Sequence, residues 1–371
     1  MSTRKKSPFI FRALFRTILI VCGVAMLLSY SAVYINPAKF NIPLFFGLYF
    51  IPILAINVFL LIIALIRRSA SAWIPFFALI PSLLYAERFY NLGFDEHIER
   101  EGIKLKIESC NVGMFSGAKG KQERNLSKEG ERVWTKKNFY SHFKDINPDI
   151  ICLQEFLVES PLEADTIFSQ YKYRTHHLFR IRNNKYFGNI ILSKFPIKNS
   201  GYIGFKHSTN LSIYADINHY GRDVRIYNNH LESYNVSFSS LIQKFSETKD
   251  LTTTQIKNDI VETHEKMLGT FIKRTDQVDQ ILTTISNTSI PSIICGDFND
   301  TPMSYTYNRL CKDREDSFIE GGKGFGATFA PMWPLLRIDY ILYPSEYECA
   351  DHITHKMNLS DHYPVSATII I

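Results

Sequence analysis

The chain has 371 residues, of which 46% are hydrophobic and 21% are charged, and its formal net charge is +6. Residues 1–90 hold nine Lys or Arg and one acidic residue, so this region carries a charge of +8 and the remainder carries −2. Because the positive charge belongs to the N-terminal region, composition does not indicate a basic, nucleic-acid-binding surface on the larger C-terminal part.

Three long apolar runs fill the N-terminal region, at residues 15–35, 42–66 and 70–86. A membrane-spanning helix needs about 20 apolar residues, within a range of about 17–25. The first two runs meet this requirement, and the third is at its lower limit. A cleaved signal peptide is the alternative for the first run, but it lacks a small-x-small cleavage site before a soluble segment. We therefore predict that residues 1–90 form a membrane anchor with about three transmembrane helices, in contact with the lipid bilayer through residues 15–86.

The basic residues that flank these runs predict the orientation of the anchor. Five lie within residues 4–16, and Arg67 and Arg68 lie between the second and third runs, whereas the link between the first two runs has only Lys39. Loops rich in Lys and Arg stay in the cytoplasm. Three spans predict a multi-pass integral membrane protein with its C-terminal part on the non-cytoplasmic side. If the third run is only interfacial, the C-terminal part is cytoplasmic instead.

A mixed polar linker is expected at residues 91–103, followed by a large domain at residues 104–371. The domain alternates short apolar runs, which end abruptly in polar residues, with some amphipathic stretches. Helical periodicity is present at 136–146 and 258–286, and residues 234–275 are typical of a helical insertion near the site. Many strands with few helices predict an α/β fold of stacked sheets flanked by helices. The expected strands lie at 104–113, 149–156, 187–197, 211–217, 224–231, 292–300, 337–343 and 365–371.

Polar side chains gather where the apolar runs end. A carboxylate directly after a buried run, such as Glu155 after Ile150–Gln154, is costly unless it is paired, hydrogen-bonded or bound to a metal. Clusters of Asn, Asp, Glu and His without thiols form a hard-oxygen donor set, which favours Mg²⁺, with Mn²⁺ or Ca²⁺ as alternatives. These clusters are Asn111, Gln154 with Glu155, Asn229 with His230, Asp297 with Asn299, Asp339, and Asp361 with His362.

With these residues in this order, the chain resembles the endonuclease/exonuclease/phosphatase superfamily. The resemblance covers roughly residues 104–371, and seven short motifs occur in the order of the family. It implies a four-layer α-β-β-α sandwich like that of deoxyribonuclease, with the active site at one end of the two sheets. The motifs are Asn111 after the first strand, LQE at 153–155, GNIILSKFPI at 188–197, NNHLES at 228–233, GDFND at 296–300, RIDYI at 337–341 and SDHYPV at 360–365.

The resemblance also implies the metal ligands. Glu155 corresponds to the principal ligand of the divalent cation, with Asn111 beside it as a ligand or as an orienting residue. Asp361 corresponds to a second carboxylate of the metal site. A cation is expected in such a site because a phosphodiester is anionic and repels nucleophiles.

Five further residues take catalytic roles by the same resemblance. Asp297 would position or deprotonate the attacking water, and Asn299 would orient the water or the phosphate. His230 would donate a hydrogen bond to a phosphate oxygen or assist the leaving group. His362 would act similarly on the transition state, paired with Asp339, which would set its tautomer and favour its charged form. A purely structural pairing of Asp339 with Arg337 is the alternative for that carboxylate.

The sequence therefore predicts a membrane-anchored, metal-dependent phosphoesterase that hydrolyses a phosphodiester or phosphomonoester by attack of water. Its substrate partner would be a phospholipid head group or nucleic acid, and no protein partner is inferred. One alternative is a membrane-tethered endo- or exonuclease, and another is a catalytically silent binding module on the same fold. The apolar segment Phe325–Leu336 could face a membrane or a substrate, or could pack on the sheet.

Overall fold

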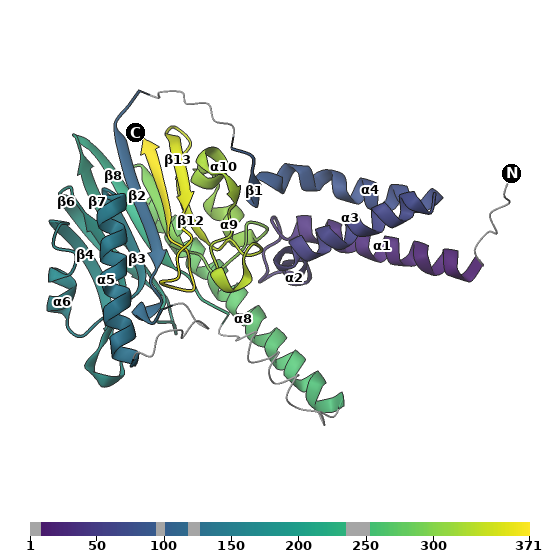
Figure 1. Cartoon of the computed structure of the whole chain (residues 1–371), viewed down its shortest axis with the longest axis horizontal. Coiled ribbons are helices and arrows are strands. Elements are labelled where there is room, and N and C mark those ends of the chain that lie inside the picture. The colour runs from purple at the N-terminus through teal and green to yellow at the C-terminus, as the bar shows by residue number, and fades with distance from the viewer. Residues whose placement is uncertain (1–8, 94–100, 118–126, 235–252) are drawn as a thin grey trace.

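The structure is a computed structural model that describes residues 9–93, 101–117, 127–234 and 253–371. Its β-rich part lies at one end, and a bundle of apolar helices extends from it as an arm (Figure 1). The helices of the arm are α1 (Phe9–Ser31), α2 (Ile42–Leu48), α3 (Phe50–Ile66), a 3₁₀ turn at Ala70–Ala72, α4 (Trp73–Leu79) and the 3₁₀ helix Ile80–Arg88.

The β-rich part contains two six-stranded sheets packed face to face. The first has the order β13-β14-β2-β3-β5-β4 and the second has the order β10-β12-β9-β8-β7-β6. The strands of the first sheet are β2 (Lys104–Asn111), β3 (Ile150–Val158), β4 (Tyr173–Arg180), β5 (Tyr186–Ser193), β13 (Glu348–Thr354) and β14 (Val365–Ile370). Those of the second are β6 (Ile197–Gly204), β7 (Leu211–His219), β8 (Arg222–His230), β9 (Ser292–Asp297), β10 (Arg314–Asp316) and β12 (Asp339–Pro344).

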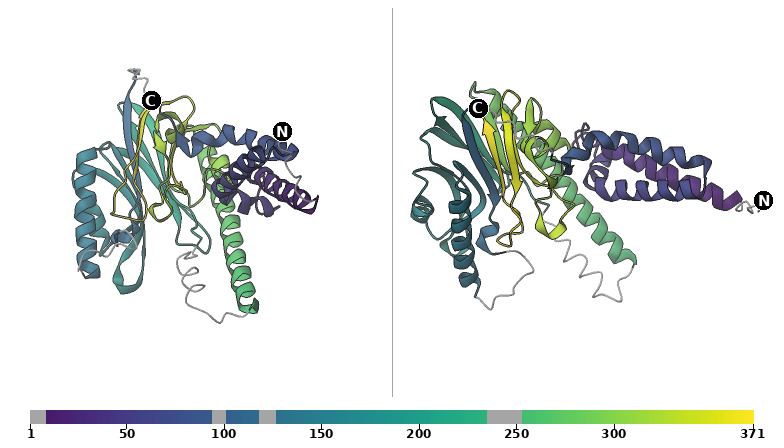
Figure 2. Two further views of the ribbon diagram at one scale, coloured as in Figure 1. Left: turned by 45° about the vertical axis from the view of Figure 1, so that its right-hand side comes forward. Right: turned by 45° about the horizontal axis from the view of Figure 1, so that its top comes forward.

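Alternation along these strands produces three apolar layers. Buried side chains such as Ile107 on β2 and Ile226 on β8 meet between the sheets, because successive side chains of a strand point to opposite faces. Phe139 of α5 packs on the outer face of the first sheet, and Ile281 of α8 packs on the outer face of the second. The two stacked sheets and the outer helices that the sequence predicts are therefore present (Figure 2). The outer helices are α5 (Lys128–Ile146), α6 (Pro161–Thr166), α8 (Thr253–Ser286), α9 (Tyr305–Leu310) and α10 (Ser317–Gly321), with short 3₁₀ turns at Gly113–Phe115, Arg182–Asn184 and Ala330–Met332.

The expected helical insertion at 234–275 falls partly on described residues. Residues 253–275 belong to α8, whose C-terminal half packs on the sheet, whereas residues 235–252 lie outside the described residues. In Figure 1, α8 extends beyond the sandwich on the side of the helical arm.

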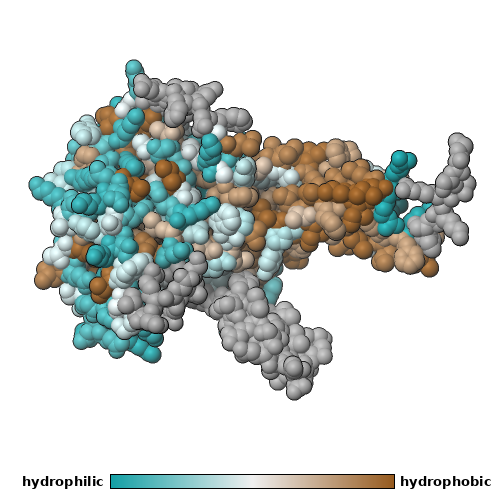
Figure 3. All heavy atoms as spheres, viewed as in Figure 1, coloured by the Kyte–Doolittle hydropathy of each residue, from teal (hydrophilic) through white to brown (hydrophobic). Residues whose placement is uncertain are grey.

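The surface of the arm is apolar where the surface of the sandwich is mostly polar (Figure 3). Two helical stretches, Phe9–Ser31 and Ala70–Arg88, are long and apolar enough to cross a membrane. The second expected span, at 42–66, is not one continuous helix. It is divided into α2 and α3, which meet at an angle of 76°.

Proline chemistry explains this departure from the continuous 42–66 span. Pro52 lies in the first turn of α3, where its missing N–H is tolerated. Its ring excludes the carbonyl of Leu48, four residues earlier, so a helix that arrives at Leu48 cannot continue through Pro52. The chain instead breaks at Tyr49, and α2 turns toward the sandwich.

Helix α2 packs directly against the β-rich part. A Cβ atom on Gly47 would collide with the carbonyl oxygen of Met303, so glycine permits the close approach. The ring of Phe45 stacks on His264 of α8 with centroids 4.4 Å apart, and it meets the edge of Phe271 at 6.1 Å. The arm is therefore joined to the sandwich by side-chain packing as well as by the chain.

The end of the arm is also attached. Arg88 donates from Nη1 to the carbonyl of Pro302 at 2.8 Å, and its own carbonyl accepts from Nη1 of Arg337 at 2.9 Å. The next residues form β1 (Tyr90–Asn91), which pairs with β11 (Gly324–Phe325). The expected linker at 91–103 thus begins on a strand that is held by the sandwich, and residues 94–100 lie outside the described part of the chain.

Candidate active site

Strand direction brings the polar residues together at one edge of the sandwich. β2 runs parallel to β3 in the first sheet, and β8 runs parallel to β9 in the second. The two pairs run to the same edge, because Asn111 at the end of β2 donates to Asp297 at the end of β9. β12 is antiparallel to β9 and β14 is antiparallel to β2, so these two begin there. Strand ends supply Asn111, His230 and Asp297 to this edge, and a bulge within β3 supplies Glu155. Asp339 lies at the beginning of β12, and Asp361 and His362 precede β14.

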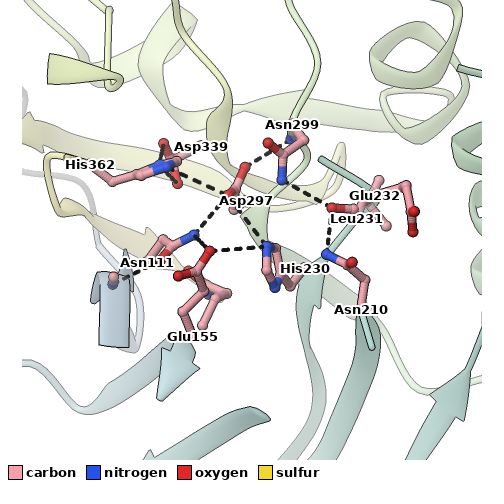
Figure 4. A network of polar contacts seen from close by, with 12 residues as sticks. Asn111, Glu155, Asn210, His230, Leu231, Glu232, Asp297, Asn299, Asp339 and His362 are labelled. Atoms are coloured by element: carbon pink, nitrogen blue, oxygen red, sulfur yellow. Dashed lines mark hydrogen bonds and ion pairs between the residues drawn. The ribbon is translucent and has the colours of Figure 1, made fainter. Parts of the chain in front are cut away.

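Backbone register places three of these residues in one row across the second sheet. His230 of β8 is opposite Asp297 of β9, and Asp297 is opposite Asp339 of β12. His362 completes the row, because its Nδ1 lies 3.0 Å from Oδ2 of Asp339 and its Nε2 lies 3.8 Å from Oδ2 of Asp297. The carboxylate of Asp297 therefore lies between two imidazoles, with Nε2 of His230 at 3.9 Å (Figure 4).

Asn111 connects this row to the first sheet. Its Nδ2 donates to Oδ2 of Asp297 at 2.9 Å and faces Oε1 of Glu155 at 3.4 Å, while its Oδ1 accepts from the N–H of Gly113. The amide thus lies between two carboxylates and fixes both. These contacts are compatible with both roles considered for Asn111, as a ligand and as an orienting residue.

Glu155 has an unusual backbone conformation. The pairing of β3 with β5 shifts register between Leu153 and Phe156, and Glu155 in this bulge has φ = 49°. A non-glycine residue in the left-handed region is strained, and such strain concentrates at functional sites. The bulge lets the Glu155 side chain remain 27% exposed, with Oε1 3.8 Å from Nε2 of His230.

The Gly296–Asn299 turn is shaped by the backbone. Gly296 has φ = 131°, and a Cβ there would collide with the carbonyl oxygen of Asn229 on the adjacent strand, so only glycine fits. After the strand, Asn299 has φ = 52°, its N–H donates to Oδ1 of Asp297 at 2.8 Å, and its Nδ2 donates to the carbonyl of Leu231 at 3.0 Å. Both oxygens of Asp297 therefore accept a hydrogen bond.

Burial and charge act together on the two central groups. Burial raises the pKa of Asp297 above its ordinary value, and Asp339 adds to this, although His362, His230 and Asn111 oppose it. Burial would lower the pKa of His362, but the carboxylates of Asp339 and Asp297 outweigh it and raise the pKa of His362 to about 10. His362 is therefore an imidazolium at neutral pH.

The donor set fits a divalent cation. Four carboxylates, those of Glu155, Asp297, Asp339 and Asp361, surround two imidazoles, which leaves an excess of negative charge in a largely buried site. Asp361 is 8% exposed, and its carboxylate lies beside Gly113, the second residue after Asn111. Oxygen donors without thiolates suit Mg²⁺ or Mn²⁺.

Arg337 does not pair with Asp339. Its guanidinium forms a buried ion pair with Asp316, and the burial of Arg337 is compensated there. The backbone N–H of Asp339 donates to Oγ1 of Thr328 at 3.1 Å, so this contact does not occupy its carboxylate. The carboxylate of Asp339 instead contacts Nδ1 of His362.

A layer of buried amides beneath the site was not anticipated from the sequence. Nε2 of Gln154 donates to Oδ1 of Asn228 at 2.7 Å, and Nδ2 of Asn228 donates to the carbonyls of Leu153 and Ile190. These bonds join the two sheets directly below Glu155 and His230. The sequence does place Gln154 and Asn228 beside Glu155 and His230. Alternation along the strands assigns these amides to the interior, but it does not say which partners they bond.

The sequence and the fold were both compared with those of known proteins. A sequence profile described as Endonuclease/Exonuclease/phosphatase family matches residues 109–362, and one described as a domain of unknown function (DUF8431) matches residues 12–89. No curated protein matched the chain.

Solved structures share the fold at low sequence identity. The endonuclease/exonuclease/phosphatase from Beutenbergia cavernae is 14% identical over 72% of each chain, with a TM-score of 0.50. The corresponding protein from Bacteroides vulgatus is also 14% identical with a TM-score of 0.50, and the match covers 72% of this chain and 99% of that one. A family protein from Bacteroides thetaiotaomicron has the same identity and TM-score over 73% and 99%.

Proposed function

Since the chain belongs to the endonuclease/exonuclease/phosphatase family, we propose that it is a membrane-anchored, divalent-metal-dependent phosphoesterase that hydrolyses a phosphodiester or phosphomonoester by attack of water. One observation carries the proposal. A buried carboxylate, Asp297, lies within 4 Å of the imidazole nitrogens of both His230 and His362 at the edge where the sheets end. A binding module has no physical need for this arrangement.

Asp297 is proposed as the general base. Its raised pKa makes its carboxylate a stronger base than an ordinary aspartate, which suits removal of a proton from water. The water oxygen would bond to phosphorus as the bond from phosphorus to the leaving oxygen breaks, and the water proton would pass to Asp297. Asn299, whose N–H is fixed on Oδ1 of Asp297, would hold the base and the water in line.

His362 is proposed to stabilise charge. Because Asp339 and Asp297 hold it as an imidazolium, it offers a fixed positive charge to the phosphate oxygens, on which negative charge grows in the transition state. His230 lies on the other side of Asp297 and would donate a hydrogen bond to a phosphate oxygen or protonate the leaving oxygen. Asp339 fixes the orientation of His362 through Nδ1.

Glu155 and Asp361, with Asn111 between Glu155 and Asp297, are proposed to hold Mg²⁺. Mg²⁺ would supply Lewis-acid stabilisation of the phosphate charge when it is bound. The strained conformation of Glu155 supports this role, since the bulge keeps its carboxylate exposed at the site rather than in the sheet.

A pH profile tests the role of Asp339. The wild-type rate, as kcat/KM, should fall at acid pH as Asp297 gains a proton and fall again as the pH passes about 10 and His362 loses its own. Asp339→Asn removes the charge that contributes most to raising the pKa of His362, so its alkaline limb should shift to lower pH. The exposed Asp313→Asn should leave the profile unchanged. An alkaline limb at the same pH in Asp339→Asn would show that Asp339 does not set the charge of His362.

The helical arm is proposed to be the membrane anchor, with Phe9–Ser31, the bent pair Ile42–Ile66 and Ala70–Arg88 as its spans. Its apolar surface supports this (Figure 3). Helix α1 starts and α3 ends at the end of the arm far from the sandwich, where the guanidinium of Arg67 lies 4.9 Å from the ring of Phe15 (Figure 1). The basic residues of early α1 and those that follow α3, Arg67 and Arg68, therefore belong to the same end of the arm. Their positive charge supports a cytoplasmic location for this end and a non-cytoplasmic location for the sandwich.

The orientation has a direct test. A reporter enzyme that is active only outside the cytoplasm, fused after Ile371 of the full chain, should be active. The same reporter inserted after Arg68 should be inactive, which provides the internal control. Activity at Arg68 and none at Ile371 would invert the proposed topology.

The rim of the site favours a substrate that lies in the membrane. Phe325 and Trp333 are 45% and 42% exposed, and the ring of Phe325 contacts both Trp333 and Tyr90 of the attached end of the arm. Exposed aromatic rings beside a membrane anchor are typical of the bilayer interface. The same segment carries Phe329, which pairs with His362 through a backbone bridge. The rim and the slight negative charge of residues 91–371 together favour a phospholipid head group over nucleic acid.

Substrate turnover tests the function. The full chain in detergent or lipid discs should hydrolyse a phospholipid presented in mixed micelles with Mg²⁺, and EDTA should stop turnover until Mg²⁺ is restored. DNA, RNA and a soluble bis-phosphodiester serve as parallel substrates. Faster hydrolysis of nucleic acid would identify the tethered nuclease instead. Failure to turn over any of the four, with Mg²⁺ binding demonstrated, would support the silent binding module.

A further inference from the structure

A second cluster of titratable side chains lies on the opposite face of β2 from the active site. Side chains alternate along a strand, so Asn111 faces the space between the sheets and Glu108 faces helix α5. There Glu108 meets His142 of α5 and His355, which follows β13. Their ligand atoms all lie within 4.8 Å of one another, and none of the three takes part in the proposed reaction.

Glu108 lacks a full set of partners. It has no exposed surface, and its Oε1 forms a short contact with Nε2 of His142. Its Oε2 has no hydrogen-bond partner among the described residues, although it is buried. A buried carboxylate with an unsatisfied oxygen is costly, so this oxygen points to a missing cationic partner.

His355 is prepared to act as a ligand. Its ring is perpendicular to that of His142, with centroids 4.9 Å apart, and its Nε2 lies 2.8 Å from Oγ of Ser366. A ring that a hydrogen bond holds in one orientation is the arrangement in which proteins present histidine to a metal.

We propose that Glu108, His142 and His355 bind a zinc ion, at a site separate from the catalytic magnesium site. Two imidazoles with one carboxylate suit zinc better than magnesium, which prefers oxygen ligands. Three protein ligands leave a fourth position of a tetrahedral site for water. On binding, the contact between Nε2 of His142 and Oε1 of Glu108 would be replaced by a bond from each group to the cation.

The location of the site gives the ion a structural role. Its ligands come from strand β2, helix α5 and the start of the 355–364 segment, whose N–H at His355 donates to the carbonyl of Pro364. That segment carries Asp361 and His362. Zinc would therefore fasten the outer helix to the sheet and hold the first residue of the segment that delivers His362 to the active site.

Metal content of the full chain tests the proposal. The purified protein is stripped with a chelator, incubated with zinc, desalted and analysed by mass spectrometry of the elements. Wild type should retain one zinc per chain, and His142→Gln and His355→Gln should retain none. The matched histidine variant His176→Gln, on β4, and the catalytic-site variant Glu155→Gln should both keep the ion. Zinc should also raise the melting temperature of wild type and His176→Gln, but not that of the two cluster variants.

Two results would overturn the proposal. One is a wild-type chain that retains no zinc, which would leave the three residues as a hydrogen-bonded cluster. The other is zinc that persists in folded His142→Gln and His355→Gln or is lost in Glu155→Gln, which would place the ion elsewhere. If the cluster variants fail to fold, cobalt-substituted wild type decides, since tetrahedral cobalt with imidazole ligands absorbs visible light strongly. Absence of these bands would contradict the site.

Discussion

Asp297→Asn should lower kcat by about 10²–10⁴-fold, the range that a general base contributes. The substitution keeps the size of the side chain and can retain the hydrogen bond from the N–H of Asn299, but it cannot accept a proton from water. Single-turnover measurements of the full chain with Mg²⁺ and its best substrate would give the rate. A variant with a near-wild-type rate would remove Asp297 from the mechanism.

The same variant should not be less stable. The folded protein raises the pKa of Asp297, chiefly by burial, so its folded pKa exceeds its unfolded one. The stabilising effect of this difference is present only at low pH and is lost as the pH rises through the folded pKa, so at neutral pH the charged carboxylate is a net cost. Replacing it by a neutral amide should leave the melting temperature in EDTA equal or higher, as at other active sites that exchange stability for function.

Asp300→Asn is the matched control for Asp297→Asn. Burial also raises the pKa of Asp300, but its carboxylate is the counter-charge of the fully buried guanidinium of Arg274, 3.8 Å away, and raises the pKa of Arg274, whereas His362 beside Asp297 keeps Asp339 as a partner. Removing the charge of Asp300 leaves a buried cation without its carboxylate, which is strongly destabilising. We expect Asp300→Asn to lower the melting temperature and retain turnover in the cold. The two aspartates, three residues apart, should thus give opposite results.

Glu155→Gln should reduce turnover by at least about 10²-fold, the scale of losing one preorganised electrostatic partner. Gln is isosteric, so the bulge and the contact with Nδ2 of Asn111 can persist while the negative charge is lost. The Mg²⁺ concentration for half-maximal rate should rise sharply, which can be measured by titrating Mg²⁺ into the stripped protein. The control variant Glu159→Gln changes an exposed glutamate just after β3 and should leave both quantities unchanged. An unaltered Mg²⁺ titration in Glu155→Gln would move the cation to other ligands.

The arrangement of the sheets was largely readable from the sequence. Apolar runs such as Ile150–Gln154 marked the strands, and the family resemblance implied that their polar ends, Glu155 and Asp297 among them, share one end of the sheets. Pairwise contacts were not readable, because they depend on register. That His230, Asp297 and Asp339 form one row follows from how β8, β9 and β12 align, which no local pattern specifies.

Long-range packing accounts for the remaining differences. The break at Tyr49 follows from a local rule, the exclusion of the Leu48 carbonyl by Pro52, but hydropathy alone reads 42–66 as one span. The pairing of Arg337 with Asp316 rather than Asp339 depends on residues 21 apart that meet only in the folded chain. Gly47 and Met303, which meet where the arm packs on the sandwich, are even further apart in the sequence.

That contact has a consequence for how the protein reaches its substrate. A flexible linker of n residues would let a domain wander over about 5–6 Å × √n, but α2 and Arg88 hold the sandwich against the arm. With the arm in a bilayer as proposed, the catalytic edge would stay at one height and one tilt. Such an enzyme works in cis, on molecules of its own leaflet, and its rate follows their surface mole fraction rather than their bulk concentration. Vesicles that lack the protein should then remain untouched beside vesicles that contain it.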